Sequence, residues 1–566
     1  ASWDGVPPWY ETRSKAWKFF TGAGADLAAK AHSNREDKKP GSLRSLAEAM
    51  QSWRTASVAL LSFSSGLPLG LVWIAIPDWM RNVGVDIRIV GLFTLAQVPW
   101  SFKVLWSPLM DRFVPPWLGR RRGWAAIAQT ILSVLTLMLA GVGHHPDTPW
   151  VVMALALAIA FASASQDIAI DAYAVDVLRP EEQGVAVGAR VAIYRAAMFV
   201  AGGLAITLAG RYSWPLVNVA LALCYLPMLL VTWRAPEPEK KFPSPRSLGK
   251  AVWHPFLGFL SRHRAIEILA FVVFYKFADN LAQSLTRPFL IDMGYSDFDR
   301  GVALATVGLL GTLLGTFFGG AVTTVIGLGH SLWVFGFLQI FSNLGYVLVA
   351  GSEVNRALMY GATGFEQLTS GMGTGAFSVL LLRMTQKRFS ATQYALFSSL
   401  FGLPRIVAGP ITGFVVDAVG WRTYFWITMV CGIPGMLLLG RFVPLGAREP
   451  SFAVEPTQRR DRLSRTQLGA RGLIGGALGT GLAASLLIIL AGLKAMREPA
   501  GASFDVVSGL SALLHPTGIG DWIQLAGTAV FGTACGLFTA AVFAARHGAG
   551  GELAADEGDG KEAVSG

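Results

Sequence analysis

Charged residues are scarce in this sequence: Asp, Glu, Lys and Arg make up 15% of its 566 residues, whereas soluble domains carry about 25%. Hydrophobic residues make up 53% of the chain, and the mean hydropathy is +0.48. An ordinary soluble domain is therefore excluded. Because one membrane-spanning helix needs about 20 mostly apolar residues, the chain is long enough for a dozen or more of them.

Cysteine is scarcer still, with three residues in the chain, Cys224, Cys431 and Cys535. Each lies within an apolar run and lacks the spacing of metal ligands, so we expect neither a disulfide framework nor a metal site. We interpret all three as small packing residues.

The eight histidines are scattered, and no nucleophile lies at a suitable spacing from a base. The sequence therefore indicates neither an enzyme nor a bound cofactor.

Acidic residues are the minority among the charges, 36 against 47 Lys and Arg, which gives a formal net charge of +11. A basic excess is also typical of nucleic-acid-binding proteins, but in a membrane protein Lys and Arg gather in the cytoplasmic loops. We therefore expect membrane lipids around the chain and no nucleic-acid partner.

Apolar windows long enough to span a bilayer recur along the chain, and we predict fourteen membrane helices. The predicted spans are 56–79, 89–109, 124–143, 150–174, 187–209, 214–233, 265–290, 301–325, 330–350, 357–381, 392–418, 422–440, 472–494 and 522–545.

Basic residues gather in alternate loops, on the side of the membrane that also holds the N-terminus. The clusters are Arg112 with Arg120, Arg121 and Arg122; Lys240, Lys241, Arg246 and Lys250; Lys387 and Arg388; and Arg459, Arg460, Arg462 and Arg465. The N-terminal 50 residues lack the features of a secretory signal. The positive-inside rule then predicts a multi-pass protein with both termini in the cytoplasm.

A basic linker divides the first twelve spans into two sets of six, and the two sets match each other weakly. Gly84 matches Gly294 at an offset of 210 residues, and Trp214 matches Trp421 at an offset of 207. This parallel six-plus-six repeat resembles the arrangement of major facilitator transporters. We predict an all-α polytopic membrane protein of that fold, with two six-helix bundles, two additional C-terminal helices and the working site between the bundles.

The predicted division of the chain follows from these spans. It comprises a cytosolic N-terminal extension (1–52), the first bundle (53–233), a cytosolic linker (234–263), the second bundle (264–441), a second basic linker (442–471), an extra helix pair (472–546) and an acidic, disordered tail (547–566).

The loop between spans two and three places Asp111 and Arg112 shortly before Arg120 and Arg121. It resembles the loop signature of major facilitator transporters, although it is longer by several residues. A carboxylate at a helix end beside guanidinium groups forms charge-assisted bonds that break when the halves move. We interpret these four residues as a gating loop, with a simple membrane anchor as the alternative.

Ionisable residues within the spans are informative, because each costs at least about 2.5–3.5 kcal/mol at the bilayer centre unless it faces a cavity or a partner. In the fourth span, Asp167 and Asp171 lie one helical turn apart. Two close carboxylates raise each other's proton affinity, so this pair is a candidate for carrying a proton. Alternatively, they neutralise Arg190 and Arg195 of the fifth span, and each explanation can hold for a different carboxylate.

The seventh span carries polar residues at helical spacing: Lys276, Asp279, Asn280, Gln283 and Arg287. In a continuous helix these five side chains lie on one face. A polar stripe of this kind is hard to keep against lipid, so we expect it to line a cavity. Glu366 in the tenth span and Lys103 in the second add further charge.

Several blocks resemble the AmpG family of bacterial muropeptide permeases. They are residues 65–69 (SGLPL), 102–112 (FKVLWSPLMDR), 119–124 (GRRRGW), 163–168 (SASQDI) and 389–396 (FSATQYAL). The blocks occur in family order over about residues 50–445. The resemblance implies a proton-driven importer of the bacterial inner membrane, which carries N-acetylglucosamine linked to 1,6-anhydro-N-acetylmuramic acid, with or without the stem peptide, for peptidoglycan recycling. Such fragments also induce β-lactamase in some bacteria.

From the cargo that the resemblance implies, we predict roles for the charged and polar residues within the spans. Cations suit the carboxylates of a stem peptide, and amides and acids suit sugar hydroxyls. The predicted substrate-binding residues are Lys103, Gln166, Arg190, Tyr194, Lys276, Asp279, Asn280, Gln283 and Arg287, and the predicted proton-coupling residues are Asp167, Asp171 and Glu366. The resemblance implies a role most directly for Asp167. The partners expected are the glycopeptide and protons, and the chain is expected to act as a monomer.

Two other functions fit the same fold. One is a related carrier of another anionic solute, such as acetyl-CoA, and the other is a non-transporting receptor or assembly factor. The charges within spans four, seven and ten favour a carrier, because a scaffold does not need them.

Overall fold

The structure is a computed structural model that describes residues 43–547, except for 87–88, 91–92, 144–148, 239–244, 246, 263, 451–462, 496–510, 512–514 and 517. Within the described ranges the chain is helical and contains no β-strand. Most of the N-terminal extension, the middle of the second linker and the acidic tail lie outside the described residues, and so do the predictions made for them.

The first half of the chain is a bundle of long helices joined by short connections. Its elements are α2 (Leu43–Gln51), α3 (Trp53–Gly70), η1 (Leu71–Ala75), α4 (Ile76–Asn82), η2 (Phe93–Gln97), α6 (Val98–Phe102), η3 (Lys103–Leu105), α7 (Ser107–Arg112), α8 (Arg120–Gly141), α9 (Pro149–Val177), α10 (Pro180–Phe199), η4 (Val200–Leu204), α11 (Ala205–Arg211), α12 (Trp214–Leu223) and α13 (Tyr225–Arg234). The second predicted span is broken into short pieces, with Pro99 and Pro108 near the starts of two of them.

The second half repeats this pattern after the linker helix α14 (Leu248–Leu260). Its elements are α15 (Ala265–Phe274), α16 (Phe277–Ser284), α17 (Thr286–Asp292), α18 (Asp297–Gly301), η5 (Val302–Val307), α19 (Gly308–Ile326), α20 (Leu328–Ala350), α21 (Arg356–Met384), η6 (Lys387–Phe389) and α22 (Ser390–Phe442). The windows 392–418 and 422–440 both fall in α22, which breaks at Gly420, where φ is +76°. Glycine adopts this left-handed conformation without the strain that a side chain causes.

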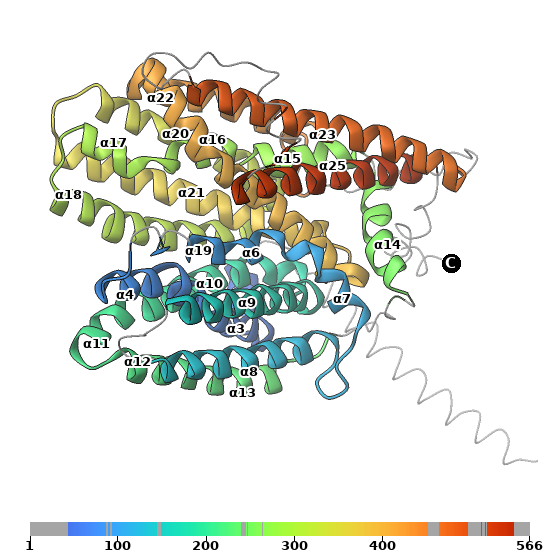
Figure 1. Ribbon diagram of the computed structural model, residues 1–566, viewed down its shortest axis with the longest axis horizontal. Helices are drawn as coiled ribbons and strands as arrows, with labels where there is room; N and C mark the ends of the chain where they lie inside the picture. Colours follow the sequence, from blue (N-terminus) through green and yellow to red (C-terminus); the bar gives the residue numbers. More distant parts are fainter. Residues whose placement is uncertain are drawn as a thin grey trace, which may run out of the picture.

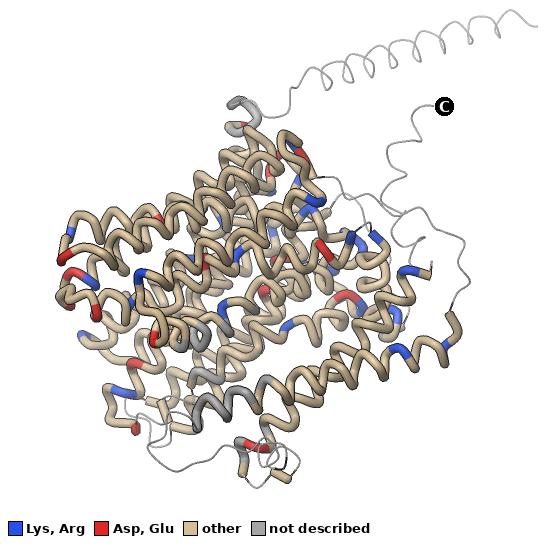
Figure 2. The backbone as a smooth tube through the Cα atoms, turned by 90° about the horizontal axis from the view of Figure 1, so that it is seen from above, with Lys and Arg blue, Asp and Glu red and all other residues tan. Residues whose placement is uncertain are grey.

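The two halves form two layers, with the blue-to-teal helices of the first half below the green-to-orange helices of the second half (Figure 1). Helices α10 and α19 cross where the layers meet, and α22 packs against α9. Nine helices of the described chain are long and apolar enough to cross a membrane. In Figure 2 the charged residues gather toward the ends of the helices, with a few inside the bundle.

Glycine allows the close crossing of α10 and α19. A Cβ atom added at Gly320 would lie 2.1 Å from the carbonyl oxygen of Gly184, and one added at Gly184 would lie 2.3 Å from the carbonyl oxygen of Gly320. Both distances are too short for any side chain, so the two backbones touch directly across the boundary between the halves.

The last two long helices, α23 (Arg465–Ala495) and α25 (Ile519–Arg546), pack against each other along the second half (Figure 1). Their contact is made through small residues, with Gly479 against Cys535 and Gly475 against Thr539. Small residues let membrane helices approach closely. Helix α14 also contacts α25, so the linker helix joins the pair to the rest of the chain.

Candidate functional site

A cavity of about 560 Å³ lies between the two halves. Its wall comes from α10 of the first half and from five helical segments of the second half. The lining residues are Val191, Arg195, Lys276, Asp279, Asn280, Gln283, Ser284, Leu304, Gly308, Leu309, Thr312, Thr316, Gln367, Ser370, Thr374, Phe401 and Arg405. Pockets for small ligands commonly have this size and this mixture of apolar surface with a few placed polar groups.

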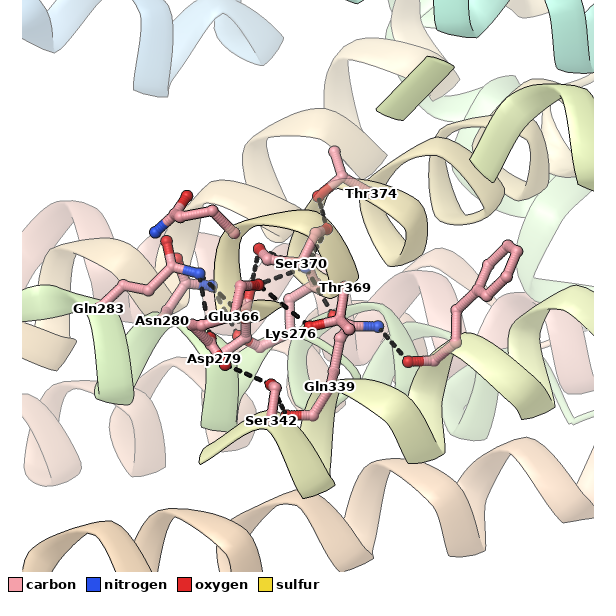
Figure 3. A network of polar contacts seen from close by, with 12 residues as sticks. Lys276, Asp279, Asn280, Gln283, Gln339, Ser342, Glu366, Thr369, Ser370 and Thr374 are labelled. Carbon is pink, nitrogen blue, oxygen red and sulfur yellow. Dashed lines mark hydrogen bonds and ion pairs between the residues drawn. The ribbon is translucent and has the colours of Figure 1, made fainter. Parts of the chain in front are cut away.

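The second half supplies a buried polar network to this cavity (Figure 3). The Lys276 ammonium group donates to Asp279 Oδ2 at 2.7 Å, to Gln339 Oε1 at 2.6 Å and to the carbonyl oxygen of Ser370 at 3.0 Å. The Ser370 hydroxyl donates to the same Asp279 oxygen at 2.7 Å. Asp279 is therefore held by a cation and a hydroxyl within the protein.

A second buried acid, Glu366, belongs to the same network and is 0% exposed. The Gln283 amide bridges the two acids, because it donates to Asp279 Oδ1 at 3.0 Å and to Glu366 Oε1 at 3.3 Å. Ser342 contacts the other Glu366 oxygen. The Ser342 hydroxyl also lies 2.9 Å from the carbonyl oxygen of Gln339.

The helix of the seventh predicted span is interrupted, and this interruption determines where its polar side chains lie. The helix is interrupted between α15 and α16, where Lys276 has φ −105° and ψ 5°, and again at Leu285, with φ −123° and ψ 34°. Discontinuous helices expose backbone groups where a membrane protein lines a cavity. The predicted stripe is thereby divided: its first four residues line the cavity, whereas Arg287 on α17 is exposed and is not part of the cavity wall. The expectation of one continuous polar face was wrong, because it assumed an unbroken helix.

The first half carries a separate charge cluster. Asp171 forms ion pairs with Lys103, at 3.1 Å, and with Arg190. Asp167, one turn earlier on α9, is 8% exposed, and its Oδ1 atom accepts no hydrogen bond from the described residues. The two carboxylates thus differ: Asp171 has the role of counter-ion to an arginine, and Asp167 keeps a buried oxygen without a donor.

Two other predicted residues lie beside this cluster. Gln166 is fully buried and donates to Ser64 on α3. Tyr194 on α10 lies close enough to Asp167 to interact with it electrostatically. Neither residue is part of the cavity wall in this conformation.

The loop predicted to act as a gate does join the two halves. Asp111 is 0% exposed, and its Oδ1 atom accepts from Arg120 at 2.6 Å and from Arg121 at 2.8 Å. Its Oδ2 atom accepts from the backbone N–H of Thr392 at 2.9 Å and from the Thr392 hydroxyl at 2.6 Å. The Arg121 guanidinium reaches the Ser390 hydroxyl at 2.6 Å. These contacts join the two halves at one end of the bundle, which we call the Asp111 end.

Arg112, the fourth residue of the predicted gating loop, has a different position. Its guanidinium lies 5.5 Å from the centre of the Phe113 ring, a cation–π distance. The cross-half contacts come from Asp111, Arg120 and Arg121.

Four residues of α22 that face the first half were missed by the sequence analysis. Ser390 and Thr392 bond to the gating loop, Tyr394 lies near Arg190, and Arg405 lines the cavity. Arg405 lies inside an apolar window, and the charge-in-membrane argument that singled out Arg190 applies to it equally.

Comparison with known proteins agrees with this architecture. The family model of the Major Facilitator Superfamily matches residues 58–408. The anhydromuropeptide permease of Escherichia coli strain K12 is 40% identical over 388 residues, which cover 68% of this chain and 79% of that protein. An uncharacterized protein of Haemophilus influenzae is 34% identical over 400 residues, or 68% of this chain and 94% of the relative.

Among solved structures, the superfamily transporter FucP in its outward conformation aligns with a TM-score of 0.54 at 14% identity, covering 68% of this chain and 97% of FucP. The chain therefore belongs to the Major Facilitator Superfamily, and within it to the AmpG-type permeases. The predicted all-α polytopic fold is confirmed, and the protein is a membrane transporter of small molecules rather than an enzyme. The comparisons do not favour an acetyl-CoA carrier or a non-transporting receptor.

Proposed function

We propose that this protein is a proton-coupled symporter that imports anhydro-muropeptides across the bacterial inner membrane. The cargo is N-acetylglucosamine linked to 1,6-anhydro-N-acetylmuramic acid, with or without its stem peptide. The observation that carries the proposal is the polar cavity between the halves, in a chain 40% identical to an anhydromuropeptide permease over both halves. The imported fragments then enter peptidoglycan recycling.

The cavity chemistry supports a glycopeptide cargo. Asn280, Gln283 and Gln367 offer amide donors and acceptors for acetamido groups and sugar hydroxyls, and Ser370 and Thr374 add hydroxyls. Such groups pair with the neutral polar atoms of a sugar. The apolar part of the wall, which includes Leu309 and Phe401, provides surface for the sugar rings.

Two buried acids are the candidates for the coupled proton. The single hydrogen of the Ser342 hydroxyl faces both the Gln339 carbonyl oxygen and Glu366. Because a hydroxyl donates one hydrogen bond, a proton on Glu366 satisfies both contacts, with Ser342 donating to Gln339. Asp279 is held ionised by Lys276, so Glu366 carries the proton of this pair. Asp167 is the candidate in the first half, since a protonated carboxyl needs fewer donors than an ionised one.

The gating loop supports a particular orientation of the protein in the membrane. The Asp111 end also holds the basic clusters around Arg120 and Arg388, which contact each other. We assign this end to the cytoplasm, in line with the positive-inside rule, and place both termini there. Closure at Asp111 then corresponds to a carrier whose cavity communicates with the periplasm. Both halves belong to one chain, so a monomer suffices for transport.

Uptake of labelled anhydro-disaccharide tripeptide into right-side-out membrane vesicles tests the function. We expect accumulation that depends on an inward proton gradient and stops when a protonophore collapses it. Vesicles without the protein provide the control for leakage. Uptake that is unaffected by the protonophore would contradict symport, and the absence of any protein-dependent uptake or exchange would contradict the cargo.

A further inference from the structure

Two arginines face the cavity without a carboxylate partner among the described residues. Arg195 comes from α10 of the first half and Arg405 from α22 of the second half, and both line the cavity. Neither forms an ion pair with an acid of the described chain. By contrast, Lys103, Arg190 and Lys276 each bind an aspartate. Within the described chain, aspartates therefore neutralise Lys103, Arg190 and Lys276, whereas Arg195 and Arg405 have no acidic partner.

The cavity as a whole has an excess of positive charge. Four charged side chains line it: Arg195, Lys276, Asp279 and Arg405. Asp279 is already bound by Lys276, whereas Arg195 and Arg405 line the same cavity, so their like charges repel each other. A cation in the membrane-spanning region needs either a cavity or a partner. These two face the cavity, so a negatively charged group that enters it meets two guanidinium groups.

We infer that Arg195 and Arg405 form a clamp that binds the carboxylate groups of the transported ligand, with one guanidinium from each half. This inference rests on the proposed function and names the ligand groups that its cavity recognises. A guanidinium binds a carboxylate through two parallel hydrogen bonds, which fix orientation as well as charge. A stem peptide carries several carboxylates, and the lactyl group of the peptide-free disaccharide carries one.

The position of the clamp links binding to movement of the halves. In the empty carrier, repulsion between Arg195 and Arg405 opposes their approach. A bound carboxylate lies between them and attracts both, so closure of the cavity becomes favourable when the ligand is present. A ligand shifts such an equilibrium only through a difference in its affinity for the two states, and the two arginines provide that difference.

A matched pair of ligands tests the clamp. One is the anhydro-disaccharide tripeptide, and the other is the same molecule with its carboxyl groups converted to carboxamides. Binding to the purified full-length protein is measured for the wild type, Arg195→Gln, Arg405→Gln and Arg405→Lys. Arg211→Gln is the control, because Arg211 is exposed on α11 and lies outside the cavity wall.

We expect the wild type and the control to prefer the carboxylate ligand, and each Arg→Gln variant to lose about tenfold affinity for it. Affinity for the carboxamide ligand stays within about twofold, since it has no carboxylate to lose. Arg405→Lys keeps part of the preference. Equal losses for both ligands, or no loss for either, would overturn the clamp while leaving the muropeptide function intact.

A second measurement is independent of the cargo. If the two guanidinium groups repel each other in the empty protein, Arg405→Gln raises the thermal stability of the ligand-free carrier, and Arg211→Gln does not. A lower stability for Arg405→Gln would mean that Arg405 holds the fold together, and would overturn the clamp. The wild type could fail to bind either muropeptide while Arg405→Gln is more stable than the wild type. This result would contradict the proposed cargo and would support a clamp that binds a different carboxylate ligand.

Discussion

Thr392 donates two hydrogen bonds to one carboxylate oxygen of Asp111, from its backbone N–H at 2.9 Å and from its hydroxyl at 2.6 Å. The two residues belong to different halves of the chain and are 281 positions apart. The other Asp111 oxygen accepts from Arg120 and Arg121. One buried carboxylate thus connects a loop of the first half to the start of α22, and its charge holds the contact together.

Replacement of Asp111 tests this connection. Asp111→Asn removes the charge that Arg120 and Arg121 share, and breaking a buried ion pair costs about 3–5 kcal/mol. We expect a lower melting temperature and uptake reduced about tenfold or more, because the closed state loses its main contact. Asp297→Asn is the control, since that side chain is 97% exposed. A variant with wild-type stability and uptake would show that Asp111 is only part of a membrane anchor.

The same contact has a predictable pH dependence. Asp111 lies beyond the predicted end of the second span at residue 109. Burial alone raises its pKa, but the attraction of Arg121 and Arg120 and the bond from Thr392 outweigh burial, so its pKa lies below the ordinary value of 3.8. A carboxyl with a lowered pKa contributes stability that is present above its unfolded pKa and is lost as the pH falls through the folded pKa.

We therefore expect the contribution of Asp111 to be constant from neutral pH to about pH 5 and to fall only below about pH 4. The measurement is the difference in melting temperature between the wild type and Asp111→Asn as a function of pH. A difference that disappears between pH 7 and pH 5 would mean that the carboxyl takes up a proton in the working range, and would make Asp111 part of the coupling chemistry instead.

The crossing of α10 and α19 provides a steric test. A Cβ atom at Gly320 would lie 2.1 Å from the Gly184 carbonyl oxygen, so Gly320→Val forces the halves apart at this point. We expect uptake to fall about tenfold or more because the closed state becomes strained. Gly361→Val on α21 is the control, since nothing lies within 4 Å of a Cβ atom added there. Equal uptake by Gly320→Val and Gly361→Val would show that α10 and α19 can separate at this point without destabilising the closed state.

The sequence was sufficient for the fold and for single-helix features of the site. Hydropathy placed helices near their observed positions, and helical spacing brought Lys276, Asp279 and Gln283 to one region. The spacing of residues within one helix does not show which residue of another helix a side chain contacts. The hydrogen bonds between Thr392 and Asp111 could therefore not be predicted. The break at Lys276 was also missed, because no proline or glycine marks it in the sequence.

The ion pair between Arg190 and Asp171 provides a way to distinguish two roles for Arg190, as a counter-ion or as a substrate-binding residue. If Arg190 is mainly a counter-ion, Arg190→Gln leaves Asp171 with Lys103 alone and destabilises the protein by about 3–5 kcal/mol. The triple variant Lys103→Gln/Arg190→Gln/Asp171→Asn then recovers most of that stability, because Asp171 loses its charge together with both of its cationic partners. Thermal unfolding of the single and triple variants checks this. Normal stability of Arg190→Gln combined with lost uptake would instead indicate a substrate-binding arginine.

The proposed proton site gives the sharpest kinetic prediction. Glu366→Gln resembles the protonated acid and keeps a donor toward Ser342, so binding and exchange of cargo between the two sides of the membrane do not need the gradient. We expect exchange within about twofold of the wild type and gradient-driven accumulation reduced about tenfold or more. Asp279→Asn provides the contrast: it leaves the buried Lys276 ammonium group without its carboxylate, so we expect both activities to fall together with stability. Normal accumulation by Glu366→Gln would exclude Glu366 as the proton carrier, and the same experiment with Asp167→Asn would then decide whether the proton is carried in the first half.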